Sequence, residues 1–243
     1  MQGSHLWLPL PFLSMRKIKT TLYVDGFNLY YGALKSTPYL WLNPVAMASK
    51  IFTRNSIVRT KYFSAPVSSM PNDKNVNIRQ QDYWNGLKTI PSLEIIPGHF
   101  KKREKRAKNV HNKHFTWVYQ TEEKGSDVNL ASHLLMDAFK GDFDAAIVIS
   151  GDSDLVSPIR MVKEELRKTV CVLNPQLTEG DYARTRRKQT ELKSASSLYK
   201  PAIRERFLRN SQMEINLPSA NGFIEKPKQW CRPYPATTKT KRA

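Results

Sequence analysis

The sequence predicts an α/β fold in which a central, mainly parallel sheet is flanked by helices. Apolar runs of strand length recur along the chain, and the clearest of them covers 145–149. Longer segments with apolar residues at helical spacing separate several of these runs. A strand at 145–149, a helix at 155–166 and a strand at 169–173 form a compact crossover unit. Such units join parallel strands, so we expect parallel pairing.

The same patterns predict the elements in order. Strands are predicted at 19–24, 57–63, 93–96, 115–119, 145–149 and 169–173. Helices are predicted at 28–34, 44–52, 76–90, 127–140 and 155–166. Asn43 before Pro44 is typical of a helix start, and Ser126 is expected to cap the helix that follows it. Residues 101–108 are too basic to pack internally.

The chain has 243 residues, enough for one α/β domain with tails. We expect a leader or misassigned start at 1–17, the domain at 18–175, a basic, mostly helical extension at 176–216 and a basic, disordered tail at 217–243. The apolar stretch at 6–13 is short, contains prolines and follows no basic residue. These features argue against a signal peptide.

The composition indicates the kind of partner. A formal net charge of +18 and a pI near 9.9 favour a polyanion, most often nucleic acid, over a basic surface that is merely solvated. Cys171 and Cys231 are the only cysteines, so we expect neither a disulfide framework nor a zinc finger, and a cytoplasmic location fits. No stretch approaches the roughly 20 apolar residues of a membrane helix.

Four acids are predicted to meet at one edge of the sheet. Asp25 ends the first strand, Asp152 and Asp154 follow the strand at 145–149, and Asp127 lies in the first turn of its helix. In an open parallel sheet the functional crevice lies at the carboxyl ends of the strands, where crossover helices also begin. Converged carboxylates repel one another, so such a cluster either has raised pKa values or binds a cation. Oxygen ligands suit Mg²⁺ or Mn²⁺, and such a site can hydrolyse a phosphodiester.

Each of these residues also has a purely structural interpretation. Asp127 could favour its helix dipole, and Asp152 and Asp154 could cap an ordinary strand–helix turn. Asn28 could cap the first helix. Asp25 is the hardest to explain in this way, because it follows a run of buried type.

Three motifs carry a resemblance to a known family. They are VDGFN at 24–28, KGSDV at 124–128 and SGDSDL at 150–155. Their order and spacing resemble those of NYN domains in the PIN-like nuclease superfamily, and the stretch FIEKPKQW at 223–230 is similar to the closing stretch of bacterial members. The resemblance implies a PIN-like three-layer sandwich that cleaves RNA with Mg²⁺ or Mn²⁺.

The resemblance also implies roles for individual residues. Those carried over as metal-binding and catalytic are Asp25, Asp127, Asp152 and Asp154, with Asn28 as a further catalytic residue beside the metal. One position departs from the pattern, because many relatives carry a further acid where this chain has His133. Asp137 lies one turn further along the predicted helix.

Basic and aromatic residues are candidates for binding RNA. The basic ones are Lys101, Lys102, Arg103, Lys105, Arg106, Lys124, Arg186 and Arg187. Their contacts with phosphates would be independent of sequence and sensitive to salt, unless the block at 101–108 is only a solvated loop and Lys124 only a solvated side chain. Four aromatic residues could stack on bases or pack the first helix against the sheet, and packing is favoured: Tyr30, Tyr31, Tyr39 and Trp41.

The function predicted from the sequence is a cytoplasmic, metal-dependent endoribonuclease. The alternative is a catalytically weak or inactive RNA-binding regulator of the same fold, which His133 would favour. A homo-oligomer is compatible with either. An aspartyl phosphatase would need a second acid where this chain has Phe27, and no Gly-Lys-Ser/Thr loop of a Walker-type ATPase occurs.

Overall fold

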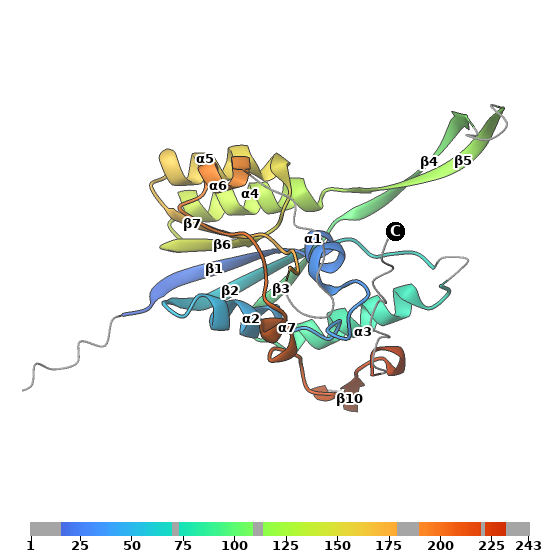
Figure 1. Ribbon diagram of the computed structural model, residues 1–243, viewed down its shortest axis with the longest axis horizontal. Coiled ribbons are helices and arrows are strands. Elements are labelled where there is room, and N and C mark those ends of the chain that lie inside the picture. The colour runs from blue at the N-terminus through green and yellow to red at the C-terminus, as the bar shows by residue number, and fades with distance from the viewer. Residues whose placement is uncertain (1–15, 70–72, 109–113, 179–189, 220–221, 232–243) are drawn as a thin grey trace, which may run out of the picture.

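A six-stranded, all-parallel sheet is the centre of the computed structural model (Figure 1), which confirms the predicted α/β class. Across the sheet the strands are β3 (Leu93–Pro97), β2 (Asn55–Ser64), β1 (Ile18–Asp25), β6 (Ala145–Ile149), β7 (Thr169–Leu173) and β8 (Leu198–Lys200). The structure describes residues 16–69, 73–108, 114–178, 190–219 and 222–231, with the backbone alone for 101–103, 108 and 118–123.

Helices cover both faces of the sheet and complete the three layers (Figure 1). One face carries α2 (Pro44–Ile51), α3 (Val76–Lys88) and α7 (Glu205–Arg209), and the other carries α4 (Ser126–Phe139), α5 (Val156–Glu164) and α6 (Thr190–Ala195). Side chains of a strand alternate between the faces, so Leu22 and Val24 enter the first core while Tyr23 enters the second. None of the helices in the described residues is long and apolar enough to span a membrane.

A hairpin arm projects from the body of the molecule (Figure 1). It consists of β4 (His99–Lys108) and β5 (Phe115–Lys124), which pair antiparallel along their whole length. The described side chains of the basic block, at 104–107, do not enter either core, as predicted, and the backbone of the block forms a strand rather than a loop. The predicted strand at 115–119 is the first half of β5.

The chain after residue 175 contributes more ordered structure than the sequence suggested. β8 lies within the segment expected to be mostly helical, and it adds the sixth strand beside β7. The segment expected to be disordered contains a hairpin of β9 (Asn216–Ser219) and β10 (Gly222–Glu225), followed by the 3₁₀ turn η3 (Lys228–Trp230). Aromatic packing explains this order, because the ring centroid of Trp230 lies 6.2 Å from that of the fully buried Trp41.

The starts of two helices differ in detail from the prediction. The first helical segment begins at Gly26, where α1 (Gly26–Leu29) continues into the π-helical turn η1 (Tyr30–Leu34). Ser126 is the first residue of α4 and not its cap. The cap position belongs to Gly125, whose φ of 97° is in the left-handed region that favours glycine. Asn43 does cap α2, by accepting from the Ala46 backbone at 2.9 Å.

Candidate active site

Asp25 is a nearly fully buried carboxylate at the carboxyl end of β1, with 2% of its surface exposed. Three donors hold it. The backbone N–H of Asn28 donates to Oδ1 at 2.9 Å, and the side-chain amide of Asn28 donates to Oδ2 at 2.7 Å. The hydroxyl of Ser150 donates to Oδ2 at 2.8 Å. Asp25 therefore caps α1, which is the capping role that the sequence offered for Asn28.

Burial raises the pKa of Asp25 above its ordinary value, and the negative charge of Asp152 raises it further. The three hydrogen bonds to the carboxylate lower the pKa and oppose these effects without cancelling them. Gly26 makes this tight turn possible, because a Cβ atom there would come within 2.8 Å of the Phe63 carbonyl oxygen and the Tyr62 ring. Asp25 is thus a carboxylate kept in a confined place by surrounding structure.

Asp25 and Asp127 line the same cavity, which has a volume of about 250 Å³. Asn28 also lines it, together with the aromatic side chains of Phe27, Tyr31 and Phe100. The rings of Phe27 and Phe100 meet edge to face with centroids 5.7 Å apart. The two acids come from β1 and from the first turn of α4, so the predicted meeting at this edge of the sheet is observed for this pair.

The loop after β6 is tied to the same site through backbone and side-chain hydrogen bonds. The N–H of Gly151 donates to Asn28 Oδ1 at 3.3 Å, and the N–H of Asp152 donates to the Ser150 hydroxyl at 3.0 Å. Asp152 is half-buried and also caps η2 (Ser153–Leu155), accepting from the Asp154 N–H at 3.0 Å. Asp154 is exposed and is not among the residues that line the cavity.

The donor chemistry of the cavity fits Mg²⁺ or Mn²⁺. Within the part of the chain that the structure describes, no group of three or more His, Cys, Asp or Glu side chains could hold a metal ion. Mg²⁺, however, is often bound through one or two carboxylates, with water and substrate phosphate completing its shell. Asp25 Oδ1 accepts one hydrogen bond from Asn28 and retains a lone pair for such a role.

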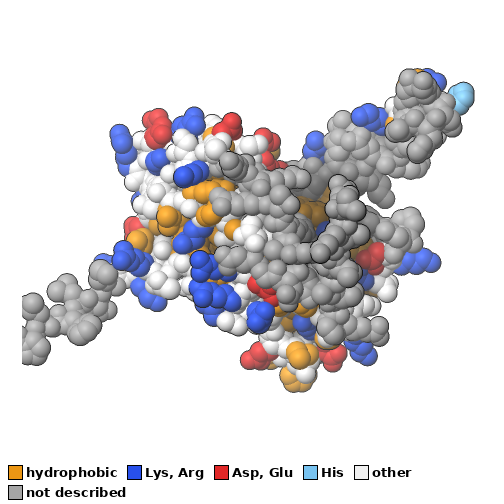
Figure 2. Space-filling view, viewed as in Figure 1, with side chains coloured by type: hydrophobic (Ala, Val, Ile, Leu, Met, Phe, Trp, Pro, Cys, Tyr) orange, Lys and Arg blue, Asp and Glu red, His pale blue; other side chains and the backbone are white. Residues whose placement is uncertain are grey.

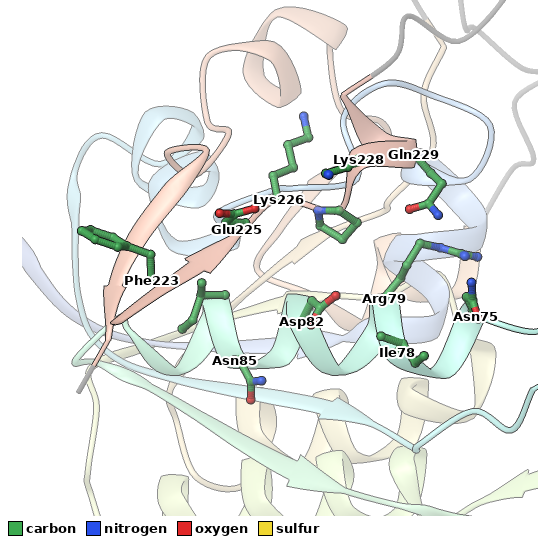
Figure 3. Close-up of a pocket in the computed structure, with 12 residues that line it drawn as sticks. Asn75, Ile78, Arg79, Asp82, Asn85, Phe223, Glu225, Lys226, Lys228 and Gln229 are labelled. Atoms are coloured by element: carbon green, nitrogen blue, oxygen red, sulfur yellow. The ribbon is translucent and has the colours of Figure 1, made fainter. Parts of the chain in front are cut away.

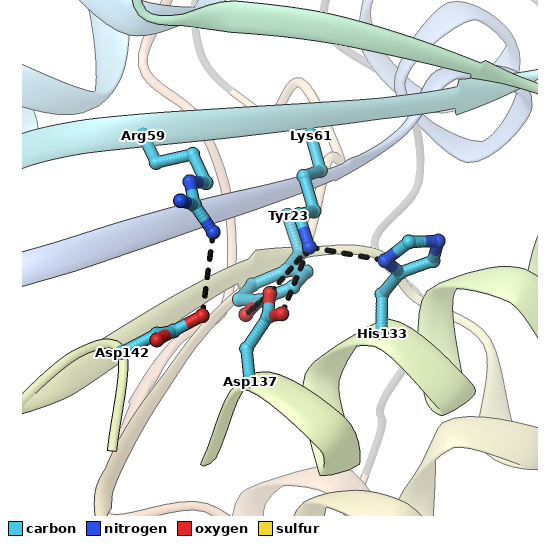
Figure 4. Close-up of polar contacts among 6 residues, drawn as sticks. All are labelled: Tyr23, Arg59, Lys61, His133, Asp137 and Asp142. Carbon is cyan, nitrogen blue, oxygen red and sulfur yellow. Dashed lines mark hydrogen bonds and ion pairs between the residues drawn. The ribbon is translucent and has the colours of Figure 1, made fainter. Parts of the chain in front are cut away.

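His133 belongs to a buried polar cluster that the sequence did not predict (Figure 4). The ammonium of Lys61 on β2 lies 2.6 and 2.9 Å from the two carboxylate oxygens of Asp137 and 3.0 Å from His133 Nδ1. The hydroxyl of Tyr23 donates to Asp137 at 2.7 Å. Lys61 and Asp137 are each 5% exposed, so this is a buried ion pair. Asp137 is therefore engaged with Lys61 and not with the cavity.

This geometry fixes the protonation of His133. An ammonium group can only donate, so Nδ1 accepts and the proton of the neutral ring lies on Nε2. Partial burial and the charge of Lys61 lower the pKa of His133, while Asp137 and Glu94 raise it. A protonated Nε2 cannot ligate a metal, so His133 does not replace the missing acid as a ligand in this arrangement. Lys61 itself was a usable signal, because it is a charged residue inside a predicted strand of buried type.

The predicted RNA-binding residues occupy different places. Lys105 and Arg106 are exposed on β4, and Lys124 is exposed where β5 ends beside α4. The side chains of Lys101, Lys102 and Arg103 and the whole of Arg186 and Arg187 lie outside the described residues. Figure 2 shows Lys and Arg side chains spread over the described part of one face of the body and along the arm.

The four aromatic candidates divide into two pairs. Tyr39 and Trp41 are buried in the core, which confirms the packing interpretation for these two. Tyr30 is 37% exposed and Tyr31 is 52% exposed, and Tyr31 lines the cavity.

A second cavity of about 480 Å³ lies between α3 and the C-terminal hairpin (Figure 3). Its lining shares no residue with the cavity of Asp25 and includes both acids, Asp82 and Glu225, and bases, Arg79, Lys226 and Lys228. Burial raises the pKa of Asp82 and lowers that of Lys226. This mixture of charges selects neither an anion nor a cation, so we assign no ligand to it.

Comparison with known proteins agrees with the motifs. A family model described as the NYN domain matches residues 19–193, which confirms the resemblance. A curated relative, 6-hydroxy-3-succinoylpyridine 3-monooxygenase HspA of Pseudomonas putida (strain DSM 28022 / S16), is 25% identical over 201 residues, covering 71% of this chain and 64% of that protein. A solved protein of unknown function, VPA0982 of Vibrio parahaemolyticus RIMD 2210633, aligns with a TM-score of 0.46 and 18% identity over 78% of this chain and 95% of that chain.

Proposed function

Because the chain belongs to the NYN domain family, which is a PIN-like nuclease family, we propose that it is a metal-dependent endoribonuclease. The observation that supports this most directly is the cavity shared by Asp25 and Asp127, two acids from separate elements at the carboxyl edge of the sheet. The strongly basic chain suits an RNA substrate, because Lys and Arg side chains bind the phosphates of an RNA backbone.

In this proposal Asp25 and Asp127 hold Mg²⁺ or Mn²⁺, and Asp152 and Asp154 supply further negative charge from the loop after β6. A cation of this kind, when bound, neutralises phosphate charge and lowers the pKa of water. Asn28 and Ser150 keep the carboxylate of Asp25 in one orientation through their hydrogen bonds. Phe27 and Phe100 line the cavity with apolar rings, which reduce the access of bulk water.

The test is cleavage of single-stranded RNA by the full chain with Mg²⁺ or Mn²⁺. Asp25→Asn and Asp127→Asn should each lower the rate by about a hundredfold or more, because each removes a charged oxygen ligand. Asp142→Asn is the matched control, since Asp142 is a surface acid just before β6, at the opposite edge of the sheet, and should keep full activity. Unchanged cleavage by both cavity variants would exclude this site.

An RNA-binding regulator without cleavage is the second candidate function. The observation that favours it is the hydrogen bond between Lys61 and His133, because it removes His133 as a replacement for the missing acid. This candidate predicts RNA binding that weakens with salt and no cleavage in either metal. RNA cleavage by the wild type that is lost in Asp25→Asn would reject this second candidate.

A further inference from the structure

The β4–β5 arm begins at the candidate cavity. Phe100, the second residue of β4, lines the cavity together with Asp25 and Asp127. At the other strand, β5 ends at Lys124, and α4 begins two residues later with Asp127 in its first turn. A ligand lying along the arm would therefore reach the carboxylates at its base.

The outer half of the arm presents aromatic side chains to solvent. Trp117 is 69% exposed and Phe115 is 59% exposed. The two residues are two positions apart in β5, so they lie on the same face of the hairpin. Arg106 is the direct partner of Trp117 in the antiparallel register, and its guanidinium carbon lies 5.2 Å from the centroid of the Phe115 ring. Arg106, Phe115 and Trp117 form what we call the stacking face.

The charge of the arm indicates the chemistry of the ligand. β4 carries six Lys or Arg and one acid, Glu104. The two acids of β5, Glu122 and Glu123, are paired in register with Lys101 and Phe100 near the base. Cations outnumber acids in both the outer and the inner half of the arm, and a polyanion is the partner that this charge complements.

We propose that the stacking face binds single-stranded RNA by stacking on its bases and leads the strand to the cavity. Exposed aromatic rings interleaved with cations suit single strands, whose bases are free, whereas a duplex hides the faces of its bases. Trp117 lies about 23 Å along β5 from Lys124, at the rise of an extended strand. The inference rests on the proposed function for the identity of the polymer, and its test measures binding only.

The experiment compares two oligomers of about 12 units in EDTA, by fluorescence anisotropy with the full chain. One is oligouridine RNA, and the other is an abasic backbone with the same phosphates. Trp117→Ala should weaken binding of the RNA by about five- to a hundredfold, because one stacked base is lost, and should leave binding of the abasic backbone unchanged. Trp117→Phe, which keeps a ring, should retain most of the affinity.

Two matched variants separate stacking from charge. Lys105→Gln changes a residue whose register partner is Val118, on the face opposite to Trp117. Because this change leaves the stacking face intact, it should affect both oligomers alike and reduce the slope of log affinity against log salt by at most about 0.7. Phe223→Ala removes an aromatic side chain that is 74% exposed on β10, away from the arm, and should change neither affinity.

Several outcomes would overturn the inference. An equal loss for both oligomers in Trp117→Ala, or no loss for either, would exclude base stacking. Binding of duplex RNA that depends on Trp117 to the same degree would exclude selection of single strands, and tighter binding of DNA of the same sequence would exclude RNA as the preferred ligand. Absent cleavage with intact, Trp117-dependent binding would reject the nuclease and retain the arm, so the two proposals fail separately.

Discussion

Asp25 is a buried carboxylate whose oxygens are held by hydrogen bonds. It is almost fully buried, which raises its pKa, and it accepts three hydrogen bonds that favour its charged form. A residue serving only to cap α1 could do so from an exposed position, as helix caps commonly do. Keeping a carboxylate in a confined cavity is costly for the folded state and useful for holding a cation.

The Lys61–Asp137 ion pair makes a stability prediction. Lys61→Met leaves the buried carboxylate of Asp137 without its cation and should lower the free energy of unfolding by about 3–5 kcal/mol. The double variant Lys61→Met/Asp137→Asn removes both charges and keeps an acceptor for Tyr23, so it should recover most of that loss. Urea unfolding measures both.

The control for this prediction lies two residues away on the same strand. Arg59 pairs with Asp142 at 3.4 Å, and the side chains are 50% and 37% exposed. Arg59→Met should therefore cost less than about 1 kcal/mol. Equal losses for Lys61→Met and Arg59→Met would show that the buried pair is no more important than the exposed one.

The lowered pKa of His133 leads to a prediction of how the free energy of unfolding depends on pH. Its pKa is lowered from 6.5 in the folded protein, so the unfolded chain binds more protons as the pH falls through that value. This difference destabilises the fold on acidification from about pH 7.5 to about pH 5.5. His133→Gln should lose less stability over that interval than the wild type, and His114→Gln, at an exposed position directly before β5, should behave like the wild type. A His133→Gln protein with undiminished acid sensitivity would contradict the prediction.

At the scale of elements, the C-terminal hairpin and η3 act as a cover for one core. Trp230 packs against the rings of Trp41 and Tyr83, with centroids 6.2 Å away in each case. The indole N–H of Trp41 donates to the Glu214 carbonyl at 2.8 Å, just before the hairpin. These contacts join the last described segment to a residue near the start of the chain.

Removing one side chain of this cover should lower the free energy of unfolding by a measurable amount. Trp230→Ala should lower the free energy of unfolding by about 2 kcal/mol, less than for a fully buried tryptophan because Trp230 is only half-buried. Phe223→Ala in the neighbouring strand removes an exposed ring and should change stability by less than about 0.5 kcal/mol. Thermal unfolding measures the stability of both variants. Equal losses of stability would contradict the role of the hairpin and η3 as a cover.

The sequence correctly predicts those elements that local patterns of residues specify. The buried strands at 145–149 and 169–173 have the predicted bounds, because an uninterrupted apolar run leaves few alternatives. β8 was missed because three half-exposed residues carry little pattern, and β4 because a cationic run resembles a loop. The cover was missed because its order comes from rings far away in the chain.

The same division applies to the site. The meeting of Asp25 and Asp127 follows from topology, since both lie at the carboxyl edge of the sheet. The position of Asp154 outside the cavity depends on how η2 turns, which its sequence does not reveal. The engagement of His133 with Lys61 depends on a contact between β2 and α4.

At the scale of the whole molecule, most charged side chains lie outside the cores that cover the central sheet. Apart from the buried Lys61 beside Asp137, the two cores of the sheet are largely apolar, whereas other cations lie on the body surface and along the arm (Figure 2). Long cationic side chains can remain solvated there at little cost to folding. The strong positive charge can therefore serve binding while the fold depends on burial of apolar side chains.

The central place of β1 has a consequence for biosynthesis. Among the described strands β1 is translated first, yet it pairs with β2 on one side and β6 on the other. Leu22 cannot pair with Ile147 until that residue, 125 positions later, has been synthesised, which takes on the order of ten seconds of translation. During that interval the edge of β1 that later pairs with β6 lacks its partner strand. The nascent chain is therefore a natural client for chaperones that bind exposed strands.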